Sequence, residues 1–254
     1  MKQKLGFLHI PRTGGTYLES IISEKLNPTL FINFFGTPND QRPNKISIVE
    51  NIAKDKRKQI DINKLQNWKT CKVFSGHFSL NVEKYLPKEY SYKYFTIVRD
   101  PLDRVISFVK KVTTSRTFRE YLCEDGIVGD DNFWHNYKIY VQEQKTVGLM
   151  PHERNGFNNY MTKVFAGLDL SNPYIEVDNN IYNMAIANLS KFVFIGKFEQ
   201  YPESVSRILN ICNIQSQFTH RKSSPKNIPS QVLDFIKERN RYDIKLYKKI
   251  FENV

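Results

Sequence analysis

The fold is decided by the sequence KLGFLHIPRTGGTYLESIISEKL, which occupies residues 4–26. Residues 5–10 form a short apolar run, as in a buried strand, and residues 11–15 have the composition of a turn. From residue 16 to residue 26 the apolar side chains recur at helical spacing and fall on one side, at Tyr17, Ile21, Ile22 and Leu26. The stretch therefore predicts a strand, a loop and a helix in immediate succession.

The same alternation continues along the chain. Short apolar runs at 72–77, 94–98 and 192–195 predict three more strands. Helical patterns lie between and after them, at 101–112, 115–123, 131–143, 156–166, 179–190, 200–212 and 230–251. This order predicts one α/β domain over 1–254, with a central, mostly parallel sheet flanked by helices. Segments 36–70 and 124–156 are interpreted as variable surface excursions on the acceptor side.

Composition excludes several classes of protein. The chain has 254 residues, of which 40% are hydrophobic and 13% aromatic, so disorder is excluded as its main state. The net charge of +12 favours an anionic partner or a solvated basic surface. Three cysteines without a CxxC pair argue against disulfides and a zinc cluster, and favour a reducing compartment. No run reaches the ~20 apolar residues of a membrane span, and no signal peptide is visible, so we expect a cytoplasmic protein.

The loop after the first strand has the features of an anion site. Its two glycines allow the backbone to approach a ligand closely, and the helix that follows presents backbone N–H groups at its positive end. Thr16 is expected to cap that helix, and Arg12 adds a planar fork of donors suited to phosphate or sulfate. An ordinary strand-to-helix turn is the alternative. The loop is not a Walker A motif, because no Lys follows the glycines.

A second motif, FTIVRDPLDRVISF, occupies residues 95–108. Arg99 lies just past the carboxyl end of a predicted strand, where open α/β sheets bind their ligands. Ser107 lies two turns into the following helix, and both side chains can reach one phosphate if the helix runs past it. Arg104 is expected to form a surface ion pair.

With these two motifs the chain resembles sulfotransferases that use 3′-phosphoadenosine 5′-phosphosulfate (PAPS). It is most similar to the carbohydrate branch, typified by heparan sulfate 2-O- and 6-O-sulfotransferases. The family's phosphosulfate loop, His-Ile-Pro-Lys-Thr-Gly-Gly-Thr, corresponds to residues 9–16, with Arg12 in place of Lys. The protein-tyrosine sulfotransferase branch also carries Pro-Arg here. Three later stretches resemble family stretches as well: 159–167, 194–204 and 243–247.

The resemblance implies a P-loop-like fold and a set of donor-binding residues. Arg12 and the backbone of the following residues, Thr13, Gly14, Gly15, Thr16 and Tyr17, would hold the 5′-phosphosulfate. Arg99 and Ser107 would hold the 3′-phosphate, helped by Arg221 and Lys222 in a later basic loop whose alternative is a solvated linker. The implied chemistry is metal-free, and the sequence shows no cluster at metal-ligand spacing.

His77 is the candidate general base for the acceptor hydroxyl. It ends a predicted strand in the sequence SGH, close to the loop, and imidazole titrates near neutral pH. The resemblance gives a histidine in this setting the same role. A structural histidine bound to a backbone carbonyl is the alternative. Glu19, one turn into the first helix, is a rival base, and its alternative is a residue on the helix surface.

The sequence therefore predicts transfer of a sulfuryl group from PAPS to a hydroxyl acceptor, with a glycan or glycoconjugate as its class and no nucleic-acid partner. Two other functions stay open. One is a P-loop-like kinase for a small molecule, which would need ATP and Mg²⁺. The other is a non-catalytic binder of an anionic polymer, which would show steep salt dependence.

Overall fold

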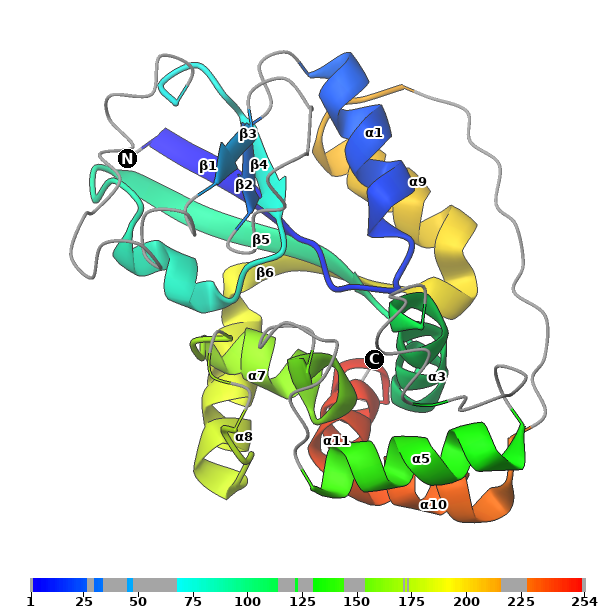
Figure 1. The fold of residues 1–254 in the computed structure, drawn as a ribbon. Helices are drawn as coiled ribbons and strands as arrows, with labels where there is room; N and C mark the ends of the chain where they lie inside the picture. Colours follow the sequence, from blue (N-terminus) through cyan, green and yellow to red (C-terminus); the bar gives the residue numbers. More distant parts are fainter. Residues whose placement is uncertain are drawn as a thin grey trace.

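The computed structural model describes residues 2–26, 30–33, 45–47, 68–113, 122, 130–143, 154–170, 172, 174–215 and 228–252. Within these ranges a six-stranded sheet has the order β3-β2-β4-β1-β5-β6, and every adjacent pair is parallel. The strands are β1 (Lys2–Leu8), β2 (Leu30–Asn33), β3 (Lys45–Ser47), β4 (Val73–Gly76), β5 (Tyr90–Val98) and β6 (Phe192–Lys197). The α/β fold with a parallel sheet is thus confirmed (Figure 1).

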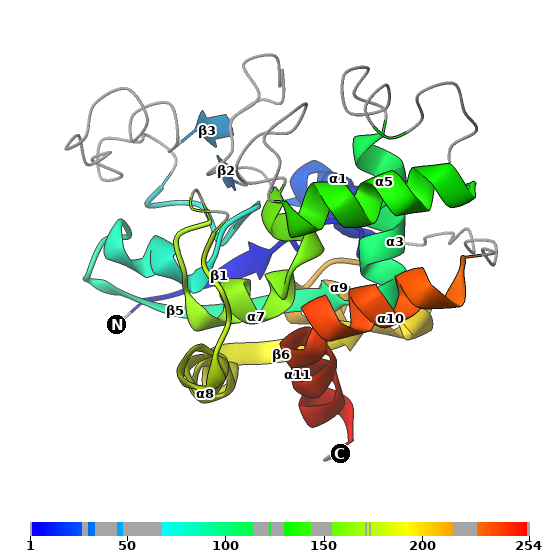
Figure 2. The ribbon, with the colours of Figure 1, turned by 60° about the horizontal axis from the view of Figure 1, so that its bottom comes forward.

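The helices of the described residues fall on both faces of the sheet and beyond its carboxyl edge (Figures 1 and 2). They are α1 (Gly15–Lys25), α3 (Pro101–Val112), α5 (Asp131–Gln142), α7 (Tyr160–Ala166), α8 (Asn179–Ala187), α9 (Tyr201–Ile211), α10 (Ser230–Arg239) and α11 (Arg241–Phe251). Short 3₁₀ turns are η2 (Leu80–Lys84), η3 (Asn155–Phe157), η4 (Asn188–Lys191) and η5 (Phe198–Gln200).

Alternation along the strands divides the core into two layers. Phe7 of β1 faces α1 and α9, where it packs with Leu18 and Val205. Leu8, the next residue, belongs to the opposite layer under α7, α8 and α11. Because neighbouring side chains of a strand point to opposite faces, both faces of the central strands are buried. A third apolar cluster joins α3, α5, η3 and α10 beyond the strand ends.

The chain leaves β1 and β4 in opposite directions, although these strands are neighbours. From β1 it passes through α1 to β2, and from β4 it passes through η2 to β5. The two connections pack on opposite faces of the sheet, since Leu18 of α1 belongs to the layer of Phe7 and Leu80 of η2 belongs to the layer of Leu8. The carboxyl ends of β1 and β4 therefore form a topological switch point, the place where open α/β sheets bind ligands.

Two sequence expectations about the elements are wrong. The segment 36–70 is not only a surface excursion, because β3 lies inside it and Trp68 is fully buried. The expected helix 230–251 is two helices, since the buried amide of Asn240 accepts from Asn159 N–H and donates to Phe157 O. Those contacts hold the chain out of helical geometry between α10 and α11.

The described residues contain neither a membrane-spanning helix nor a cluster of metal-ligating side chains. No helix within them is both long and apolar enough to cross a bilayer. Across the same ranges, no three His, Cys, Asp or Glu side chains gather in a group able to hold a metal ion. Cys71 and Cys212 are buried free thiols, while Cys123 lies outside the described residues.

Candidate active site

The loop between β1 and α1 has an unusual backbone. Arg12 has φ of 72°, and Gly14, the residue before the helix, has φ of 80°. The left-handed region suits glycine but costs another residue about 1–2 kcal/mol. An arginine held there against its preference is a feature typical of functional loops.

Neighbouring side chains fix this loop in place. The Thr13 hydroxyl is buried and donates to Ile10 O at 2.7 Å, and the Tyr201 hydroxyl of α9 donates to Gly14 O at 2.8 Å. A Cβ on Gly15 would lie 2.2 Å from the His9 ring. The expectation that Thr16 caps α1 is wrong, because the helix already begins at Gly15 and its cap residue, Gly14, has no side chain to offer.

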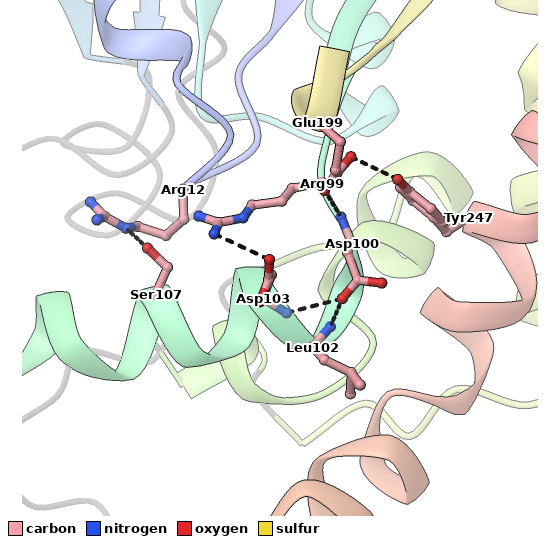
Figure 3. A network of polar contacts seen from close by, with 8 residues as sticks. All are labelled: Arg12, Arg99, Asp100, Leu102, Asp103, Ser107, Glu199 and Tyr247. Atoms are coloured by element: carbon pink, nitrogen blue, oxygen red, sulfur yellow. Dashed lines mark hydrogen bonds and ion pairs between the residues drawn. The ribbon is translucent and has the colours of Figure 1, made fainter. Parts of the chain in front are cut away.

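Arg12 joins the loop to the second motif. Its Nε donates to Ser107 Oγ of α3 at 3.0 Å, which connects residues 95 positions apart (Figure 3). Partial burial lowers the pKa of the Arg12 guanidinium, and the positive charge of Arg99 nearby lowers it further. Two cations held close together in this way repel each other, and an anion bound between them would relieve the repulsion.

Arg99 is buried directly after β5. Its guanidinium stacks over the Phe198 ring at 4.6 Å, and Nη2 lies 3.5 Å from Asp103 Oδ2. Asp100 caps α3 by accepting from the backbone N–H groups of Leu102 and Asp103 at 3.0 and 3.1 Å. The cap and Pro101 at the first position explain why the helix begins there.

His77 lies directly after β4 and faces the loop. Its Nδ1 is 2.7 Å from the carbonyl oxygen of His9. Because a carbonyl only accepts, Nδ1 carries the proton in this contact, and Nε2 of the neutral ring is the nitrogen that can accept one. The contact itself is the one expected for a structural histidine, and it leaves His77 in the tautomer that a base needs.

His9 and Glu19 form a second buried pair beneath the loop. His9 Nδ1 lies 3.2 Å from Glu19 Oε1, at ion-pair distance but without the alignment of a hydrogen bond. The His9 ring lies 4.2 Å from the His77 ring, centroid to centroid. Glu19 is 4% exposed, so the alternative that it lies on the helix surface is wrong.

Arg104 is also placed differently from its expectation. It is fully buried and donates through Nη2 to Gly156 O at 2.8 Å. Burial lowers the pKa of its guanidinium, and the carboxylate of Asp243 opposes that shift. Arg104 therefore belongs to the interior between α3, η3 and α11, and not to a surface ion pair.

The structure thus brings together most of the residues that the sequence singles out. Arg12, Arg99 and Ser107 meet at the carboxyl edge of the sheet, His77 lies at the end of β4 against His9, and Gly14 and Gly15 shape the loop. Thr16 and Tyr17 are exposed in the first turn of α1. Arg221, Lys222, most of segment 36–70 and about half of segment 124–156 lie outside the described residues.

Sequence reasoning missed the contacts of Tyr201, Glu199 and Tyr247. The Tyr201 hydroxyl holds the loop, and the Glu199 carboxylate accepts from both Asp100 N–H and the Tyr247 hydroxyl. The only available signal was that these residues lie in stretches that resemble family stretches.

Arg12 follows β1 at the switch point and Arg99 follows the neighbouring strand β5, so two cations lie at the carboxyl edge of the parallel sheet, where open α/β sheets bind their ligands. Residues 1–250 match the model of the Sulfotransferase family, and the chain belongs to that family. No curated protein matches the chain.

Solved structures of sulfotransferases are also similar to the chain. The sulfotransferase from Alicyclobacillus acidocaldarius is 10% identical, with a TM-score of 0.49 over 99% of this chain and 96% of that one. The mouse sulfotransferase SULT7A1 complexed with PAP is 10% identical, with a TM-score of 0.34 over 96% of this chain and 66% of that one. Neither likeness is close enough to support an argument about residues.

Proposed function

We propose that the protein transfers a sulfuryl group from PAPS to a hydroxyl of a carbohydrate, leaving 3′-phosphoadenosine 5′-phosphate (PAP). Family membership supports sulfuryl transfer. The observation that carries the rest is the junction of the two motifs, where Arg12 of the first loop donates to Ser107 of α3 beside Arg99. One edge of the sheet then offers cations to the anionic groups at both the 3′ and the 5′ positions of the nucleotide.

The proposed donor site uses the two guanidinium groups differently. Arg12 and the backbone N–H groups of residues 13–17, at the N-terminus of α1, would hold the 5′-phosphosulfate. Arg99 and Ser107 would hold the 3′-phosphate, and the family resemblance assigns Arg221 and Lys222 to the same phosphate. The fit rests on chemistry, since a planar guanidinium presents paired N–H donors to phosphate oxygens.

His77 is the proposed base. When bound, the donor supplies a sulfuryl group linked to a phosphate that leaves as its S–O bond breaks and the acceptor oxygen bonds to sulfur. Nε2 of His77 takes the proton that the acceptor hydroxyl loses, while Nδ1–H stays on His9 O. Arg12 stabilises the negative charge that develops on the leaving phosphate. Catalysis at this site therefore depends mainly on the alignment of the acceptor oxygen, the sulfur and the leaving phosphate, and on fixed positive charge.

A carbohydrate acceptor is supported by the resemblance to the carbohydrate branch. The arginine at position 12, shared with the protein-tyrosine branch, leaves the charge of the loop unchanged. The test is release of PAP from PAPS with a panel of neutral and acidic glycans and a tyrosine peptide. The proposal expects release with at least one glycan and none with the peptide.

The His77→Ala variant separates chemistry from binding. We expect it to abolish turnover while its affinity for PAP stays within about twofold of wild type. Glu238→Ala, at an exposed position of α10, is the control and should turn over normally. Near wild-type turnover by His77→Ala would remove His77 from the mechanism.

A further inference from the structure

One carboxylate ties together three segments behind Arg99. Glu199 lies in η5, directly after β6. Its Oε1 accepts from the backbone N–H of Asp100 at 2.9 Å, and its Oε2 accepts from the Tyr247 hydroxyl of α11 at 2.7 Å (Figure 3). The side chain thus bridges the β5–α3 junction and the C-terminal helix with one oxygen each.

Two residues determine where the Arg99 side chain points, and one of them is adjacent in sequence to Arg99 and the other to Glu199. Asp100, whose N–H binds Glu199, follows Arg99 directly, and Phe198, whose ring lies 4.6 Å from the guanidinium, precedes Glu199 directly. The same residue therefore anchors the backbone that carries Arg99 and the ring on which Arg99 lies. A guanidinium held on both sides loses little freedom when it binds an anion.

The side chain of Asp100 is held in place as well as its backbone N–H. Its carboxylate caps α3 through the N–H groups of Leu102 and Asp103. Burial raises the pKa of Asp100, and burial together with the hydrogen bond to Glu199 raises the pKa of the Tyr247 phenol. Tyr247 therefore stays protonated and remains a donor to Glu199 at physiological pH.

We propose that Glu199 is a positioning residue that aims the Arg99 guanidinium and so sets the selectivity for a nucleotide with a 3′-phosphate over one without it. The inference rests on the proposed function, because it assumes that Arg99 reads the 3′-phosphate. A carboxylate repels a phosphate, and the two Glu199 oxygens accept from Asp100 N–H and the Tyr247 hydroxyl, so the residue acts through Asp100 and Phe198 and not on the ligand.

The experiment compares the dissociation constants of PAP and 5′-AMP by titration calorimetry. Glu199→Ala should weaken PAP binding by about tenfold and leave 5′-AMP within about twofold, which lowers the selectivity ratio. Glu199→Gln should keep most of the ratio, because its amide oxygen still accepts from Asp100 N–H. Tyr247→Phe should lower the ratio by about two- to threefold, and it carries the same test if Glu199→Ala does not fold.

A double variant shows whether the effect passes through Arg99. In an Arg99→Ala background, Glu199→Ala should cost no further PAP affinity. Glu238→Ala, exposed on α10, is the matched control for loss of a glutamate. Equal weakening of both nucleotides, or full additivity with Arg99→Ala, would overturn the positioning role alone. A selectivity ratio unchanged by Arg99→Ala would overturn the Arg99 assignment in the proposed function, and the inference with it.

Discussion

Arg12 combines two properties that substitution can separate: a guanidinium that faces Ser107 and a backbone in the left-handed region. Arg12→Ala removes the guanidinium and keeps a residue that disfavours φ of 72°. Arg12→Gly removes the guanidinium and supplies the residue that tolerates this φ. Since both variants lose the same hydrogen bond to Ser107, the difference between them reports on the backbone alone.

The expected differences in stability and in PAP affinity follow from the backbone conformation of residue 12 and from the loss of its guanidinium. Relief of the left-handed conformation is worth about 1–2 kcal/mol, and the greater freedom of glycine in the unfolded chain takes back about 0.5–1 kcal/mol. Arg12→Gly should therefore be more stable than Arg12→Ala by about 0.5–1 kcal/mol, or about 1–3 °C in melting temperature for a chain of this size. Loss of a charged donor to the nucleotide should weaken PAP binding by about 10–150-fold in both.

Two measurements check this pair. Denaturant unfolding gives the difference in stability, and calorimetry gives the affinity for PAP. An Arg12→Gly variant no more stable than Arg12→Ala would refute the strain argument. Wild-type affinity in either variant would refute the role of Arg12 as an anion ligand.

The buried charges away from the site give two further predictions. Asp243→Asn removes the carboxylate that compensates the charge of the fully buried Arg104. We expect it to lower the free energy of unfolding, measured in urea, by about 3–5 kcal/mol. A loss under about 1 kcal/mol would contradict this. Burial lowers the pKa of Lys163 to about 8, so between pH 8 and the ordinary lysine pKa the unfolded chain holds a proton that the folded chain has lost. Stability of the wild type should consequently rise with pH over this window by up to roughly 3 kcal/mol relative to Lys163→Met, and parallel pH profiles for the two proteins would contradict the shift.

The parts of the fold that sequence predicts correctly are those with local signals. The strand–loop–helix unit at residues 4–26, the cap and proline that begin α3, and the apolar runs of β4, β5 and β6 are all visible in neighbouring residues. β3 has three residues in a polar segment, so it carries no periodic signal. It is identified only by its pairing with β2.

The expectations that fail concern charged residues whose partners are distant in sequence. Arg104 is at helical spacing for a surface ion pair, yet Gly156, 52 residues away, accepts from it in the interior. Glu19 has a polar side chain on a helix, yet it lies against the buried ring of His9. A single sequence reports the residue type, and long-range packing decides whether the charge is buried.

In the candidate site, too, the sequence predicts the local features and misses the contacts between distant residues. The two motifs predict the strand ends at which Arg12 and Arg99 lie, because both motifs have a strand followed by a turn and a helix. The apolar run at 72–77 predicts the strand end at His77. The Arg12–Ser107 bond and the link from Glu199 to Tyr247 connect elements far apart in the chain. These contacts become visible only when the sheet order brings β1, β5 and β6 side by side.

The central claim is that the edge of the sheet binds a nucleotide with phosphates at both its 3′ and 5′ positions. Titration calorimetry of the wild-type protein with PAP, and in parallel with ATP and Mg²⁺, tests it most directly. The account predicts saturable binding of PAP and at least about tenfold weaker binding of ATP with Mg²⁺. Absence of PAP binding would contradict the account, and tighter binding of ATP with Mg²⁺ would contradict it in favour of a kinase.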